Sequence, residues 1–122
     1  MMPSTPLSTP QEIRNEALRN SLRLVEIDIK GCRNKSCVMQ QFSEALLLPD
    51  TFGRNWDALI DVLRDLQATD IKQGLILMIL GAESLHREAP EDYAVLRDIL
   101  EEWSAEYEPT KVAAYLFDSS LH

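Results

Sequence analysis

The sequence predicts an α/β domain in which a small parallel sheet packs against helices. Apolar and charged residues alternate at 22–29, which is typical of a strand with one buried face. The run GLILMIL at 74–80 is apolar throughout, as in a parallel strand that is covered on both sides. A last strand-like run, KVAAYLF, follows at 111–117. Helical patterns separate the three runs, so right-handed crossovers would join three parallel strands, with 74–80 in the middle.

Residues 1–20 are expected to form an N-terminal extension, and residues 21–122 the domain itself. The first half of the extension is rich in Ser, Thr and Pro and is expected to be disordered. The run TPQE then resembles a helix start, with Thr9 as N-cap, Pro10 in the first turn and Glu12 reaching back. We therefore predict a short helix from Pro10 to Asn20, whose docking the sequence does not define.

Three further helices are predicted between the strands. Ser36 is expected to cap the first of them, which Pro49 ends. Asn55 is expected to cap the second, which runs to about Leu66. Pro90 opens the third, whose apolar face comprises Leu96, Ile99, Leu100, Trp103 and Tyr107.

Composition and charge narrow the classes of partner. The 122 residues suffice for one small domain, and their formal net charge is −8. Such a chain is repelled by nucleic acid and anionic membranes but attracted to basic proteins. No apolar run approaches the roughly 20 residues that span a bilayer, and the N-terminus lacks a secretory signal pattern. Cys32 and Cys37 could form one disulfide, but nothing in the sequence suggests export, so we expect a cytoplasmic protein in which both are reduced thiols.

Familiar catalytic signals do not occur in the chain. It has four glycines but neither a GxGxxG motif nor a phosphate-binding loop. His86 lies near Glu88 and Glu91, which could ligate a metal, but a stable site needs three or four convergent ligands. We interpret this stretch as a solvated loop before a helix, and we expect no catalytic residue, cofactor or metal.

The stretch PDTFGRNWDALIDVL at 49–63 raises a specific question. Gly53 is expected to take a positive φ in the turn before the helix. Helical spacing then places Asp57, Asp61 and Arg64 together, with Ile60 at the edge of that face. The opposite face is apolar and comprises Trp56, Leu59, Val62, Leu63 and Leu66. Like charges four residues apart repel on a helix. The acids are therefore either an ordinary solvated face or a site held ready for a cationic partner.

The extended run LPDTFGRNWDALIDVL resembles the signature of the barstar family of intracellular ribonuclease inhibitors. The matching residues are Leu48, Pro49, Asp50, Phe52, Gly53, Asn55, Asp57, Ala58, Leu59 and Asp61. The order of strands and helices over about 21–118 also follows the family. The resemblance implies a barstar-like sheet of three parallel strands in the order 1-2-3, packed with helices.

The resemblance also implies roles for individual residues. Asp61 would occupy the phosphate-binding pocket of a ribonuclease in place of an RNA phosphate, and Asp57 would support it. The late helix would contribute a further acid, which aligns best with Glu102 and alternatively with Glu101. The remaining residues expected at the partner interface are Asn55, Gly53, Phe52, Thr51, Arg54, Ile60 and Arg64.

Three of these positions depart from the family pattern. Thr51 replaces an aromatic residue, so a stacking side chain is lost. Arg54 replaces an acid and reverses a charge. Ile60 replaces a Trp. These changes leave the phosphate mimic intact but alter its surroundings, so the cognate nuclease need not be barnase itself.

Three functions are compatible with these patterns. The resemblance favours an immunity-type inhibitor that blocks the active site of a basic ribonuclease, either barnase-like or a toxin nuclease domain, and that is a monomer in isolation. The alternative is a barstar-fold regulatory module that binds a non-nuclease protein or another basic ligand. An enzyme using Asp57 and Asp61 as an acid/base pair is disfavoured, because such pairs need a cleft that separates their pKa values.

Overall fold

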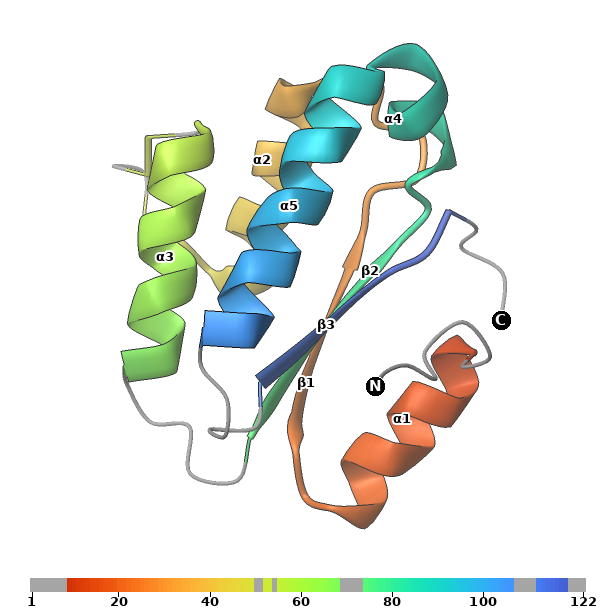
Figure 1. Ribbon diagram of the computed structural model, residues 1–122, viewed down its shortest axis with the longest axis vertical. Coiled ribbons are helices and arrows are strands. Elements are labelled where there is room, and N and C mark those ends of the chain that lie inside the picture. Colours follow the sequence, from red (N-terminus) through yellow and green to blue (C-terminus); the bar gives the residue numbers. More distant parts are fainter. Residues whose placement is uncertain (1–8, 50–51, 54, 69–73, 107–111, 119–122) are drawn as a thin grey trace.

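The computed structural model describes residues 9–49, 52–53, 55–68, 74–106 and 112–118. Helices lie on both sides of a central sheet (Figure 1). In chain order the elements are α1 (Pro10–Arg19), β1 (Arg23–Asp28), α2 (Lys35–Leu46), α3 (Trp56–Ala68), β2 (Leu75–Leu80), α4 (Glu83–Glu88), α5 (Pro90–Glu106) and β3 (Val112–Leu116).

The sheet has three parallel strands in the order β1-β2-β3. Val25 of β1, Leu77 of β2 and Ala114 of β3 lie side by side in its register. All six residues of β2 are buried, whereas buried and exposed residues alternate over the second half of β1. The predicted α/β class and the central place of the apolar run are therefore confirmed. Each strand is one or two residues shorter than the run that predicted it.

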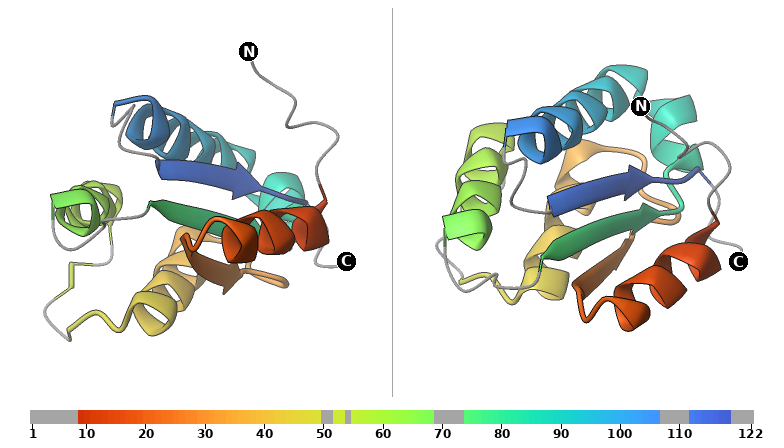
Figure 2. Two further views of the ribbon diagram at one scale, coloured as in Figure 1. Left: turned by 90° about the horizontal axis from the view of Figure 1, so that it is seen from below. Right: turned by 60° about the horizontal axis from the view of Figure 1, so that its bottom comes forward.

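The two faces of β2 contribute to separate cores. Leu75, Leu77 and Ile79 belong to a large core that also contains residues of α2, α3 and α5. The intervening residues Ile76 and Met78 belong to a smaller core on the opposite face. Figures 1 and 2 show α1 on that opposite face, across the sheet from α2, α3 and α5. Because helices cover both faces, every side chain of β2 can be apolar.

Helix α1 docks on the sheet, which the sequence did not define. Thr9 caps it as predicted: its hydroxyl accepts a bond from the Glu12 amide at 3.2 Å, and the Glu12 carboxylate accepts one from the Thr9 amide at 2.7 Å. Ile13 and Ala17 are buried against the smaller core. Burial of these two apolar side chains holds the helix in place.

The N-cap of α2 differs from the prediction. Asn34 caps this helix by accepting a bond from the Cys37 amide at 3.0 Å, and Ser36 lies inside the first turn. Asn and Ser are comparable N-cap residues, so the local sequence offers two possible starts. The chain takes the earlier start, which adds Lys35 and Ser36 to the helix.

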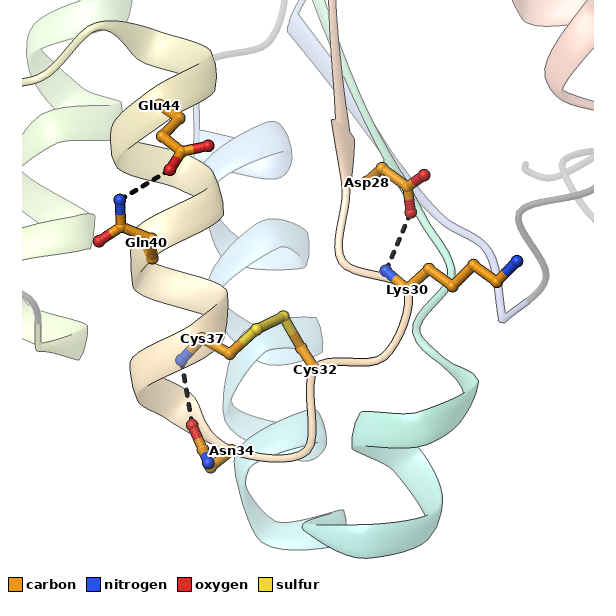
Figure 3. The surroundings of a disulfide bond; sticks show 7 residues. All are labelled: Asp28, Lys30, Cys32, Asn34, Cys37, Gln40 and Glu44. Atoms are coloured by element: carbon orange, nitrogen blue, oxygen red, sulfur yellow. Dashed lines mark hydrogen bonds between the residues drawn. A yellow bond between two sulfur atoms is a disulfide. The ribbon is translucent and has the colours of Figure 1, made fainter.

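Cys32 and Cys37 form a disulfide that joins the β1–α2 loop to the first turn of α2 (Figure 3). Their Cα atoms are 5.3 Å apart, within the usual range for a disulfide. The prediction of two reduced thiols is therefore wrong for this structure. That prediction rested on the expected cytoplasmic location, whereas the pairing depends on the turn between β1 and α2. Gly31 takes a φ of 83° in the turn before Cys32, and Asn34 starts the helix that carries Cys37.

A short helix replaces the predicted loop around His86. This residue lies in α4, where its ring stacks on Tyr93 with the centroids 3.9 Å apart. Its Nδ1 atom is 3.5 Å from a carboxylate oxygen of Asp118. Burial raises the pKa of Tyr93, and Asp118 raises it further. No group of three potential metal ligands occurs among the described residues. The six-residue helix lacks a side-chain N-cap, so it leaves little signal in the sequence.

We expect the disulfide to stabilise the fold by about 2 kcal/mol, because it closes a loop of only a few residues. Adding a reductant should lower the free energy of unfolding of the wild type by this amount, as measured by urea denaturation. A variant with both Cys32→Ala and Cys37→Ala should not respond to the reductant. Two free thiols in the denatured, unreduced protein would show that the bond is absent.

We expect Ile13→Ala to lower the free energy of unfolding by about 2–5 kcal/mol, the usual cost of truncating a buried isoleucine. Leu18 is the matched control, since it lies on the same helix but is 82% exposed. Leu18→Ala should change the stability by less than about 0.5 kcal/mol. Urea denaturation of both variants measures the difference, and equal small effects would mean that α1 is not docked in solution.

Candidate partner-binding site

Asn55 fixes the start of α3 and the loop before it. Its side-chain oxygen accepts a bond from the Ala58 amide at 2.8 Å. Its side-chain nitrogen donates to the Gly53 carbonyl at 3.3 Å. The helix begins at Trp56, as the sequence predicted. One side chain therefore satisfies an orphan amide of the first turn and also ties the loop to the helix.

Gly53 serves a different purpose from the one predicted. It is not among the glycines with a positive φ. A Cβ at this position would lie 3.3 Å from the Cβ of Ala58 and 3.3 Å from the side-chain nitrogen of Asn55. The glycine is therefore suited to the close approach of the loop to the helix. The adjacent Phe52 is partly buried against the large core, which anchors the loop from the other side.

The faces of α3 are divided as its spacing predicted. Leu59 and Leu63 are fully buried, and Ile60 is partly buried at the edge of the large core. Asp57 and Asp61 are both exposed. No ion pair or hydrogen bond within the described ranges involves either of these two carboxylates. The two acids thus lie on a helix whose opposite face is packed into the core.

Helix α5 holds α3 in position. The two helices contact each other, and both contribute side chains to the large core. The Nε1 atom of Trp103 donates to the carbonyl of Leu63 at 2.9 Å, and Trp103 is only 4% exposed. A buried hydrogen bond of this kind fixes the relative position of the two helices, because breaking it would leave a polar group unsatisfied.

A small pocket of about 30 Å³ lies between α3 and α5. Its lining residues are Ile60, Leu63, Arg64, Ile99, Glu102 and Trp103. Glu101 instead lines a separate groove between α5 and β3. The structure therefore brings Glu102, and not Glu101, to the side of α5 that meets α3. Two other candidates, Thr51 and Arg54, lie outside the described residues.

The sequence reasoning passed over Asp65. This exposed residue lies four positions after Asp61, so it extends the row of acids by one further helix turn. The same spacing that drew attention to Asp57 and Asp61 could have identified it. The row of three carboxylates makes this face of α3 suited to a cationic surface.

The family assignment agrees with this arrangement. Residues 22–119 match the family model described as "Barstar (barnase inhibitor)". The chain belongs to the barstar family. The match covers the sheet, α2, α3, α4 and α5 of the barstar fold, and α1 precedes it. A comparison with curated proteins finds no match. Among the described residues, no helix is long and apolar enough to cross a membrane.

We expect Asn55→Ala to lower the free energy of unfolding by about 1 kcal/mol, through loss of the N-cap of α3. Asn55→Asp keeps an accepting oxygen, so it should lower the free energy of unfolding by clearly less. Urea denaturation compares the two variants with the wild type. Equal losses in both would indicate that the bond to Gly53, and not the cap, is the stabilising contact.

Proposed function

We propose that this member of the barstar family is an inhibitor that binds and blocks the active site of a basic ribonuclease. One observation supports this most directly: Asp57 and Asp61 are exposed on a helix fixed by the core and have no described cation as partner. Two like charges held in this way repel each other, and a cation that approaches them offsets this repulsion. Asp61 would take the place of an RNA phosphate, with Asp57 as its support.

The chemistry of a ribonuclease active site complements this face. Such a site must hold a phosphate and stabilise negative charge in the transition state, so it carries cationic side chains. Carboxylates at fixed spacing can occupy the same positions. The repulsion between Asp57 and Asp61 would then be relieved on binding. The net charge of −8 would also speed the encounter with a basic enzyme.

The loop and α5 would complete the interface. Phe52, Gly53 and Asn55 lead directly into the helix that carries the acids. Glu102 reaches the same region from α5 through the pocket that it lines together with Ile60 and Arg64. Thr51 and Arg54 belong to the same proposed surface on the basis of the family pattern alone. The partner would be a barnase-like enzyme or the nuclease domain of a toxin.

A regulatory module that binds a non-nuclease protein is the second candidate. It would use the same acidic face, and the net charge favours any basic partner equally. The coding region next to this gene distinguishes the two, because immunity proteins are usually encoded beside their toxins. A nuclease encoded beside the gene and inhibited by this protein would support the inhibitor over the regulatory module. We propose a binding role and not an enzymatic one, because both aspartates are exposed and not enclosed in a cleft.

We propose that the protein acts inside the cell that produces the nuclease, in the cytoplasm. The disulfide weighs against this location, because disulfides persist mainly in oxidising compartments. Trapping the thiols by alkylation in intact cells tests the proposal. Alkylated Cys32 and Cys37 would support the cytoplasm, and an intact bond would place the protein in an oxidising compartment.

We expect Asp61→Ala to weaken binding to the inhibited ribonuclease by at least about 2 kcal/mol, or roughly thirtyfold. Much of the loss would come from leaving the buried cations of the enzyme unpaired. Asp57→Ala should weaken binding less than Asp61→Ala does, and Glu102→Ala should weaken it less again. Inhibition assays against barnase and against any nuclease encoded beside the gene, combined with calorimetry, provide the measurement.

The control is Glu16→Ala, which removes an exposed acid from α1, on the far side of the sheet from α3. It changes the net charge as much as Asp61→Ala does but should leave binding nearly unchanged. The thermal stability of Asp61→Ala should equal or slightly exceed that of the wild type, because a repulsion is removed. Unchanged inhibition by Asp61→Ala would refute the phosphate-mimic role.

A further inference from the structure

Arg64 is a cation on the acidic face of α3. It follows Asp61 by three residues, so the two side chains are neighbours on the helix surface. Its side chain is exposed, and none of the ion pairs between described residues involves it. Because it is exposed, the guanidinium is accessible to a binding partner.

The pocket between α3 and α5 sets the surroundings of Arg64. Four of the six lining residues are apolar, and the other two, Arg64 and Glu102, carry opposite charges. At about 30 Å³ the pocket has room for about one water molecule. The hydrogen bond from Trp103 to the Leu63 carbonyl keeps the apolar residues in place. A partner that contacts Asp61 therefore also meets an apolar pocket flanked by one cation, Arg64, and by one acid of α5, Glu102.

This arrangement restricts the proposed partner. Residues three or four apart on a helix have Cβ atoms only about 5–6 Å apart, so a surface that covers Asp61 also covers Arg64. A uniformly cationic surface would bury Arg64 against like charges, which costs desolvation as well as repulsion. A guanidinium is best satisfied by a carboxylate, which can accept two parallel hydrogen bonds.

We infer that the ribonuclease partner presents a carboxylate to Arg64, set among the cations that meet Asp57 and Asp61. Arg64 is then a specificity-determining residue, since it rejects basic surfaces that lack this acid. The inference rests on the proposed function and deepens it by specifying the charges of the partner. An RNA phosphate is a poorer ligand for Arg64, because it does not bring the surrounding cations that would offset the repulsion from the neighbouring carboxylates.

The test measures binding to the nuclease that the wild type inhibits, either barnase or the enzyme encoded beside the gene. Arg64→Ala should weaken binding by at least about tenfold. Arg64→Glu should weaken it more, because it places two carboxylates together. The affinity of Arg64→Lys should lie between those of Arg64→Ala and the wild type, because an ammonium keeps the charge but lacks the planar fork of a guanidinium.

Arg97→Ala is the matched control. Arg97 is an exposed arginine of α5 that lines the groove on the β3 side and lies 3.6 Å from Asp98. Its replacement alters the net charge as Arg64→Ala does, and it should change binding by less than about twofold. Both variants should melt like the wild type, because both side chains are exposed.

The outcomes separate this inference from the proposed function. If Asp61→Ala loses affinity while Arg64→Ala binds as tightly as the wild type or more tightly, the carboxylate partner is refuted and the inhibitor stands. If the wild type inhibits neither nuclease, the proposed function fails and this inference fails with it. Equal losses of affinity in Arg64→Ala and Arg97→Ala would mean that net charge alone explains the effect, and this would also overturn the inference.

Discussion

The burial of β2 on both faces is the constraint on which the rest of the fold depends. Six consecutive apolar residues can leave water only if the strand is central and both faces of the sheet are covered. The strands β1 and β3 supply the neighbours, and α2, α3 and α5 cover one face. The other face requires α1, which precedes the part of the chain that matches the barstar family.

The candidate site depends on this core through helix packing. Helix α3 contacts α5, which in turn contacts β3. The bond from Trp103 to the Leu63 carbonyl and the buried side chains of Leu59 and Leu63 fix the rotation of α3. That rotation leaves Asp57 and Asp61 exposed. Asp57 is favoured by the helix dipole in the first turn, but Asp61 lies a turn further on and the two acids repel each other slightly, a repulsion that the proposed cationic partner would relieve.

The local patterns predicted the helix that carries the site well, because its signals are strong and agree with one another. Asn55 caps α3, and the apolar and acidic faces lie where a 3.6-residue period puts them. Predictions failed where two local choices were nearly equal in energy or where one was inferred indirectly. Asn34 and Ser36 can both cap a helix, the role of Gly53 depends on a contact with Ala58, and the pairing of Cys32 with Cys37 depends on a turn.

The sequence by itself determined the α/β class, the central place of β2, the start of α3 and the grouping of Asp57, Asp61 and Arg64 on one face. These features follow from periodicity and capping, which act over a few neighbouring residues. Only the tertiary structure decided that α1 covers the second face, that Glu102 and not Glu101 meets α3, and that Arg64 lies beside an apolar pocket. Each of these depends on how separate elements pack. Packing is set by contacts between residues distant in the chain, which no local pattern contains.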